Sequence, residues 1–205
     1  MLTDTDKTHH ITVTGAGCDL TLLVVGGGGN ENHGDGGAGS GYLEYRSLQV
    51  SPGTVITAQV GDQRQASSLA IFGGDTVTAE PGQNSQGNYG DDGGAGYCGG
   101  GGDGSSYGGS GGSDGRDGED GDYGRGGAGT GEDVSLYTFS AWTITPGAGG
   151  MHIGFCGGGG GGLLVDGEGP EASKYQGQGF GGGGSGNSGY GDGLPGVVLI
   201  ETTPV

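Results

Sequence analysis

The sequence has few basic residues and few prolines, and it lacks any long apolar run. Six Lys and Arg stand against 24 Asp and Glu among 205 residues, so the formal net charge is −18. Such a charge repels phosphate backbones and anionic headgroups, and we expect no nucleic acid partner. No apolar stretch has the length of a bilayer span, so we expect no membrane insertion. Residues 1–7 lack the basic and apolar regions of a secretion signal. Either a signal has been removed or the chain is not secreted by that route.

The motifs of common enzyme classes are also missing. The sequence Gly-Lys-Ser/Thr does not occur, which excludes a P-loop, and the lysines are Lys7 and Lys174 alone. Residues 104–108 match the pattern Gly-x-Ser-x-Gly, but they lack the preceding strand and the following helix of a nucleophile elbow. We therefore predict that the protein is not an enzyme.

Glycine is what the sequence has in abundance. It fills 61 of 205 positions, about 30% where roughly 7% is usual. In regular structure each Gly costs roughly 0.5–1 kcal/mol relative to Ala, because its unfolded backbone is so free. The glycine-rich segments are therefore either disordered or packed in a way that only Gly permits. With 29% hydrophobic residues, the chain is expected to fill one modest core.

Short runs of β-branched and aromatic residues predict strands, and no window has helical periodicity with caps. The turn at 51–53 predicts a hairpin over residues 42–60, and residues 73–75 predict a second hairpin. The last strand is expected to share a sheet with the N-terminal strands. The predicted strands are 11–14, 19–25, 42–50, 54–60, 67–72, 76–79, 134–145, 163–166 and 197–201.

Glycine also recurs at a spacing of three, most clearly at Gly109, Gly112, Gly115, Gly118, Gly121, Gly124 and Gly127. A period of three is that of polyproline II, and with only six prolines a collagen helix is excluded. The remaining ordered solution is a bundle of polyglycine II rods, in which Gly118 and Gly121 face neighbouring rods. Asp117 and Asp120 would then face outward, so changing either to Val should be nearly silent. The alternative is a disordered low-complexity segment, but strands punctuate every glycine-rich stretch and favour order.

These patterns predict one all-β domain over residues 1–205 with essentially no α-helix. Its expected fold is a jelly-roll-like β-sandwich with an inserted polyglycine II bundle. The strand-rich parts are 9–80, 133–146, 163–166 and 196–202, and the glycine-rich inserts are 26–41, 82–131, 147–162 and 176–193.

Three parts of the sequence also resemble a known kind of module: residues 11–14 with 20–29, residues 39–42 with 50–61, and residues 181–184 with 193–201. They are similar to the glycine-rich domains of extracellular animal proteins and of bacterial or phage surface proteins. Phage tail-tip adhesins and the glycine-rich region of anaplastic lymphoma kinase carry polyglycine II bundles of this style. The resemblance implies a non-catalytic, extracellular role and transfers no binding residue. The acidic insert at 114–122 departs from the pattern.

The acidic insert holds candidate calcium ligands, because carboxylate oxygens are the ligands that Ca²⁺ prefers. The candidates are Asp114, Asp117, Glu119, Asp120 and Asp122. Neither an EF-hand nor the calcium-binding nonapeptide pattern is present. The simpler interpretation is a solvated face that keeps a glycine-rich protein soluble.

Cysteines and tyrosines supply the other candidate site residues. Cys98 and Cys156 each follow an aromatic residue and precede a glycine run, which suggests rods entered in the same register and a disulfide between them. The alternative is three small buried thiols. Exposed tyrosines in the glycine-rich stretches are candidate partner contacts, or they shield the bundle edges. The candidates are Tyr89, Tyr107, Tyr123 and Tyr190.

Two functions follow from the sequence. The first is an extracellular structural protein that associates with copies of itself or packs into a matrix or filament, with no cofactor except a possible Ca²⁺. The second is a recognition or adhesion module that binds a receptor, glycan, mineral or ice surface.

Overall fold

A computed structural model describes residues 1–30, 36–85, 92–186 and 191–204. The fold is all-β, as predicted, and the short 3₁₀ turn η1 (Val134–Leu136) is the helical element of the described chain. The strands are β1 (Thr8–Thr12), β2 (Cys18–Val25), β3 (Leu43–Val50), β4 (Val55–Gln59), β5 (Ser67–Ile71), β6 (Thr76–Ala79), β7 (Ile144–Pro146), β8 (Leu163–Val165) and β9 (Val197–Pro204). In this described part, no helix has the length and apolar character needed to cross a membrane.

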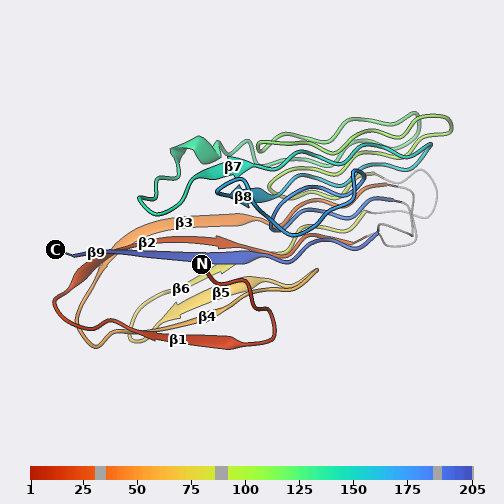
Figure 1. The fold of residues 1–205 in the computed structure, drawn as a ribbon. Coiled ribbons are helices and arrows are strands. Elements are labelled where there is room, and N and C mark those ends of the chain that lie inside the picture. The colour runs from red at the N-terminus through yellow and green to blue at the C-terminus, as the bar shows by residue number, and fades with distance from the viewer. Residues whose placement is uncertain (31–35, 86–91, 187–190, 205) are drawn as a thin grey trace.

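Two antiparallel sheets face each other and form the sandwich (Figure 1). One has the order β1-β4-β5-β6 and the other the order β3-β2-β9, with β7 and β8 in a separate pair. The hairpin of β5 and β6 and the pairing of β2 with β9 are confirmed. The hairpin over 42–60 is wrong, because β3 pairs with β2 while β4 pairs with β1 and β5. The turn at 51–53 instead leads the chain from β3 in one sheet to β4 in the other. Each of these strands then buries alternate side chains between the two sheets.

Two apolar clusters share strand β2, where the composition predicted one core. Leu20, Leu22 and Val24 point between the two sheets. Leu23 and Val25 point the opposite way, toward the glycine-rich part, and contact a second cluster that includes the fully buried Tyr97. The run of apolar residues in β2 therefore marks a strand that is buried on both faces.

The segment predicted as a long strand over 134–145 is instead a strap across the outer face of the β3-β2-β9 sheet. Only its end, β7, is a strand. Tyr137 stacks on Tyr45 of β3 with ring centroids 4.8 Å apart. At the other edge, the Glu201 carboxylate of β9 accepts bonds from the Ser140 N–H and the Ala141 N–H. The alternating apolar residues that suggested a strand are used to cover a sheet.

The glycine-rich segments continue the strands into a bundle of extended rods beside the sandwich (Figure 1). Residues 26–30 follow β2, residues 82–85 follow β6, and residues 192–196 lead into β9. In the described residues, the backbone N–H groups of the rods donate mainly to the C=O groups of other rods. A strand in a sheet bonds to the strands on its two sides, whereas a rod in the bundle bonds to several neighbouring rods. These bonds give the buried backbone N–H groups the acceptors that they need.

Successive donors of the rod 99–104 reach three different rods. The N–H groups of Gly99, Gly100 and Gly101 donate to the carbonyl oxygens of Arg116, Gly94 and Gly158, at 3.1, 2.9 and 2.8 Å respectively. The next donor, Gly102, returns to the first of these rods at Glu119, at 2.9 Å. The bonding of this rod therefore returns to the same neighbour after three residues, which is the period of an extended helix with three residues per turn.

Glycine content follows the place of a rod in the bundle. In the continuous run Gly99–Gly102 each added Cβ would lie within 2.2 Å of a backbone oxygen of another rod. In the rod 116–121 only Gly118 and Gly121 meet a neighbour in this way, each at 2.0 Å, while Asp117 and Asp120 are exposed. Uninterrupted glycine therefore marks a rod surrounded on all sides, and a period of three marks a rod at the surface.

Candidate functional site

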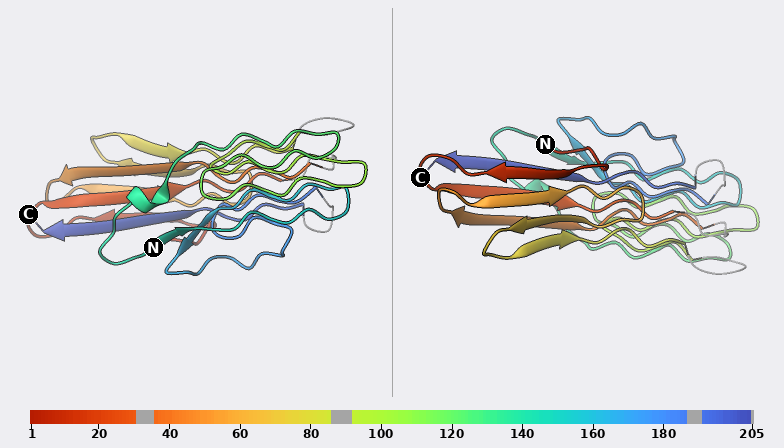
Figure 2. Two further views of the ribbon diagram at one scale, coloured as in Figure 1. Left: turned by 90° about the horizontal axis from the view of Figure 1, so that it is seen from above. Right: turned by 90° about the horizontal axis from the view of Figure 1, so that it is seen from below.

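Three turns lie together at the end of the bundle that is farthest from the C-terminus (Figures 1 and 2). They are residues 105–107, residues 122–123 and residues 152–155. The first and third are joined on either side: Gly104 N–H donates to the Phe155 carbonyl at 2.9 Å, and Gly108 N–H donates to the Gly154 carbonyl at 3.1 Å. Backbone bonds thus fix the relative positions of the turns.

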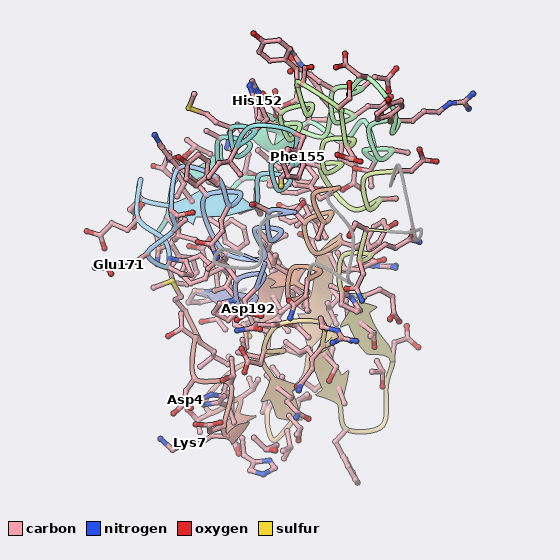
Figure 3. All side chains as sticks on the ribbon, turned by 90° about the vertical axis from the view of Figure 1, so that its right-hand side faces the viewer. Asp4, Lys7, His152, Phe155, Glu171 and Asp192 are labelled. Carbon is pink, nitrogen blue, oxygen red and sulfur yellow. The ribbon has the colours of Figure 1, made fainter. Side chains whose placement is uncertain are left out.

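Aromatic side chains stand exposed on these turns. Tyr107 is 68% exposed, Tyr123 is 71% exposed and Phe155 is 50% exposed. The Tyr107 ring meets the His152 ring edge-on, with centroids 6.1 Å apart. Figure 3 views the molecule from this end and shows His152 and Phe155 in the upper part of the view, far from Asp4 and Lys7 at the bottom. We call Tyr107, Tyr123, His152 and Phe155 the tip cluster.

A carboxylate holds the first two turns together. Asp122 accepts hydrogen bonds from the Ser106 N–H at 3.3 Å and from the Tyr107 N–H at 3.4 Å. The Asp122 N–H in turn donates to the Tyr107 carbonyl at 3.3 Å. The backbone under the Tyr107 side chain is therefore fixed by the neighbouring turn.

Three of the other four acidic candidates also accept backbone N–H groups, each at a different place. Asp117 accepts from Gly129 and Asp120 from Gly126, both at 2.8 Å, and Glu119 accepts from Ser110 at 3.2 Å. Asp114 stands at a turn with φ of 54°. The carboxylates of Asp117, Glu119 and Asp120 accept hydrogen bonds from N–H groups that point out of the bundle, where no further rod supplies a carbonyl oxygen.

The structure does not gather these five acids into one calcium site. Across the described ranges, no group of three or more His, Cys, Asp or Glu is arranged to hold a metal ion. The solvated-face interpretation was also incomplete, because Asp117, Glu119, Asp120 and Asp122 bond to the backbone of the bundle.

The disulfide prediction is wrong. None of the three cysteines is disulfide-bonded, and all are buried. The rods of Cys98 and Cys156 run in opposite directions, with Gly101 N–H bonded to Gly158 and Gly104 N–H bonded to Phe155. Position 103 is therefore opposite Cys156, and five residues at about 3.1 Å each separate it from Cys98. A disulfide needs Cα atoms within about 7 Å. Burial raises the pKa of the Cys98 thiol to about 12.

The tyrosine candidates divide by place. Tyr107 and Tyr123 are on the tip, whereas Tyr89 and Tyr190 lie outside the described residues. Tyr97 is fully buried between bundle and sandwich, and desolvation by burial raises its pKa. The sequence reasoning missed Phe155 and His152 as tip residues. Their signal was the short sequence between two glycine runs, which is typical of a turn between rods.

Comparison of the chain with protein-family models, with curated proteins and with solved structures finds no match. The resemblance to phage tail-tip adhesins and to the glycine-rich region of anaplastic lymphoma kinase stays a prediction. The functional argument therefore depends on the geometry of this molecule.

Proposed function

We propose that the protein is a non-enzymatic recognition module that adheres to its target through the tip cluster. The observation that carries this proposal is the set of exposed aromatic side chains on three hydrogen-bonded turns. Tyr and Phe side chains supply large contact areas at a small cost in conformational entropy, and aromatic residues are enriched where proteins bind. Large apolar groups left in water on one end of a molecule favour an interaction site.

The bundle supports this role by holding the turns in place before binding. The turns are bonded to the adjacent rods and to each other, so little ordering remains to oppose association. The C-terminus lies at the opposite end of the molecule (Figure 1), and the tip therefore projects away from it. We place the protein on the outside of a cell or particle, as the resemblance implies.

The net charge of the chain limits the kinds of target that the tip cluster can bind. A molecule with a net charge of −18 repels anionic surfaces. The tip itself presents rings and one imidazole, with the Asp122 carboxylate engaged by backbone donors. We infer that the target is neutral or cationic.

Structural self-assembly, the first function inferred from the sequence, has less support. Lateral packing of rods needs free N–H groups on the bundle surface, and carboxylates occupy several of them at Gly126, Gly129 and Ser110. The like charge of two copies also opposes contact. Assembly as a homo-oligomer or into a matrix stays a prediction.

Adhesion of coated beads tests the proposal. Beads coupled through a C-terminal tag present the tip outward and are scored for attachment to a panel of microbial and animal cells. We expect the triple variant Tyr107→Ser/Tyr123→Ser/Phe155→Ser to reduce attachment at least tenfold. Leu136→Ser removes a side chain that is 72% exposed on the strap, and it should leave attachment unchanged. Equal attachment of the triple variant and the native protein, or no attachment of the native protein, refutes the role of the tip.

A further inference from the structure

The outer face of the β1-β4-β5-β6 sheet is a second candidate surface, distinct from the tip. This sheet forms one outer layer of the molecule, and the view from below looks onto it (Figure 2). Strand pairing aligns its outward residues in three rows across the strands. The rows are Thr8, Gln59, Ser68 and Thr78; His10, Thr57, Ala70 and Thr76; and Thr12, Val55 and Phe72. The alternate residues, such as Ile56 and Leu69, are buried in the core between the sheets.

No Asp, Glu, Lys or Arg belongs to this face, although the chain carries 30 of them and a net charge of −18. Six of its eleven side chains are hydroxyls, and Gln59 and His10 add further polar groups. Within the face, His10 Nδ1 and Thr57 Oγ1 lie 3.2 Å apart, at hydrogen-bond distance. Most of these donors and acceptors are directed to solvent and are available to a ligand.

The spacing of the face is set by the sheet. Neighbours in a row lie about 4.8 Å apart, and successive rows lie about 6.7 Å apart along the strands. An ordered array of hydroxyls on this scale matches the scale of sugar rings and their hydroxyl groups.

One corner of the face carries a large exposed ring. Phe72 continues the outward alternation of β5 just past its end, beside Val55, and it is 85% exposed. Phe72 also borders a cleft of about 670 Å³ between β3 and the β5–β6 hairpin. This volume is in the range of small-ligand sites. The charged residues of the cleft are Arg46 and Asp75, one of each sign, so the cleft adds no net charge.

We propose that this face binds a neutral, extended polysaccharide, with a sugar ring stacked on Phe72 and hydroxyls bonded along the Thr rows. An anionic polymer is disfavoured because the chain repels it and the face offers no cation. A protein partner is disfavoured because the face has only Val55, Ala70 and Phe72 as apolar groups, which is too little for an interface core. Ice is disfavoured because Phe72 and Gln59 interrupt the flat Thr array.

Depletion assays test this proposal with insoluble cellulose and chitin as neutral probes and with alginate gel as the anionic comparison. We expect the native protein to partition onto at least one neutral polymer and not onto alginate. Ala70→Asp places a charge in the middle row, and Phe72→Ser removes the ring. Each should lower the partition coefficient at least fivefold. Ala148→Asp makes the same substitution on an exposed site of the glycine-rich bundle and should leave binding unchanged.

The tip variant Tyr107→Ser/Tyr123→Ser separates the two proposals, because it should keep full polysaccharide binding. Melting temperatures confirm that each variant is folded before binding is scored. Absence of binding to both neutral polymers overturns the inference, and so do equal affinities of the variants Ala70→Asp and Ala148→Asp. Binding that is lost only in the tip variant assigns the polymer to the tip and also overturns it. Thermal hysteresis without polysaccharide binding assigns the face to ice.

Discussion

Substitution of a single surface-rod glycine by alanine tests how the bundle is held together. A Cβ on Gly118 would lie 2.0 Å from the Gly100 carbonyl oxygen, whereas ordinary contact begins at 3.4 Å. The two rods must therefore separate by about 1.4 Å, which is more than a hydrogen bond tolerates. Three bonds hold the rod 116–121 at this point. They are Gly99 N–H to Arg116 O, Gly102 N–H to Glu119 O and Gly118 N–H to Gly127 O, at 3.1, 2.9 and 2.9 Å.

Each donor left unsatisfied costs about 1–2 kcal/mol, so Gly118→Ala should lower the free energy of unfolding by about 3–6 kcal/mol. In a chain of this length, 1 kcal/mol shifts Tm by about 2–4 °C, and the expected decrease is roughly 6–24 °C. Differential scanning calorimetry measures it. Arg116→Ala is the matched control on the same rod, because the Arg116 side chain is exposed. If the two variants melt within about 1 °C of each other, the rods are not closely packed and the reasoning is refuted.

Three further outcomes follow from the described contacts. Asp120→Ala should lower stability by about 1 kcal/mol instead of being silent, because the Gly126 N–H loses its acceptor; urea unfolding measures this, and no change would contradict the capping role. Bonds from the Ser140 backbone hold the pKa of Glu201 below its usual range, so its stabilisation is present above the ordinary Glu pKa near 4.5 and is lost as pH falls through the lowered value. Glu201→Gln should therefore be less stable than the native protein at pH 7 and match it near pH 2, and a constant difference across this range would argue against the clamp. Burial raises the pKa of Cys98 to about 12, so Cys98 should resist iodoacetamide until the chain unfolds; mass spectrometry that finds Cys98 alkylated or disulfide-bonded in the native protein contradicts this.

The strands were predictable where burial follows a simple period. The alternation of residues 54–60 predicted β4, and the Gly-Gly-Asp turn predicted the hairpin of β5 and β6. The strap over 134–145 was not predictable, because the apolar residues that cover the outer face of a sheet alternate in sequence in the same way as the residues of a strand. The hairpin over 42–60 failed because a turn sequence fixes a reversal of the chain but not the sheet that receives the next strand.

The candidate site was likewise predictable only in part from the sequence. Tyr107 and Tyr123 were candidates from the sequence because they are tyrosines within glycine-rich stretches, but the same pattern also fits the fully buried Tyr97. Grouping them with His152 and Phe155 needed the bundle, since the three turns are far apart in the sequence. The acidic insert was visible as a cluster of charges, but its role was not, because the donors that Asp117 and Asp120 accept belong to another rod.

The sequence by itself determined the all-β class, the acidic surface and the glycine period, because these depend on composition and on local backbone preference. It also contained the distinction between continuous glycine and glycine at every third position. Only the tertiary structure showed what that distinction means: residues 99–102 are enclosed by rods on every side, whereas the rod 116–121 has one side in solvent. The direction of each rod was likewise a tertiary decision, and it separated Cys98 from Cys156. A rod without internal hydrogen bonds leaves its partners to be chosen by the rest of the fold, and no local pattern specifies them.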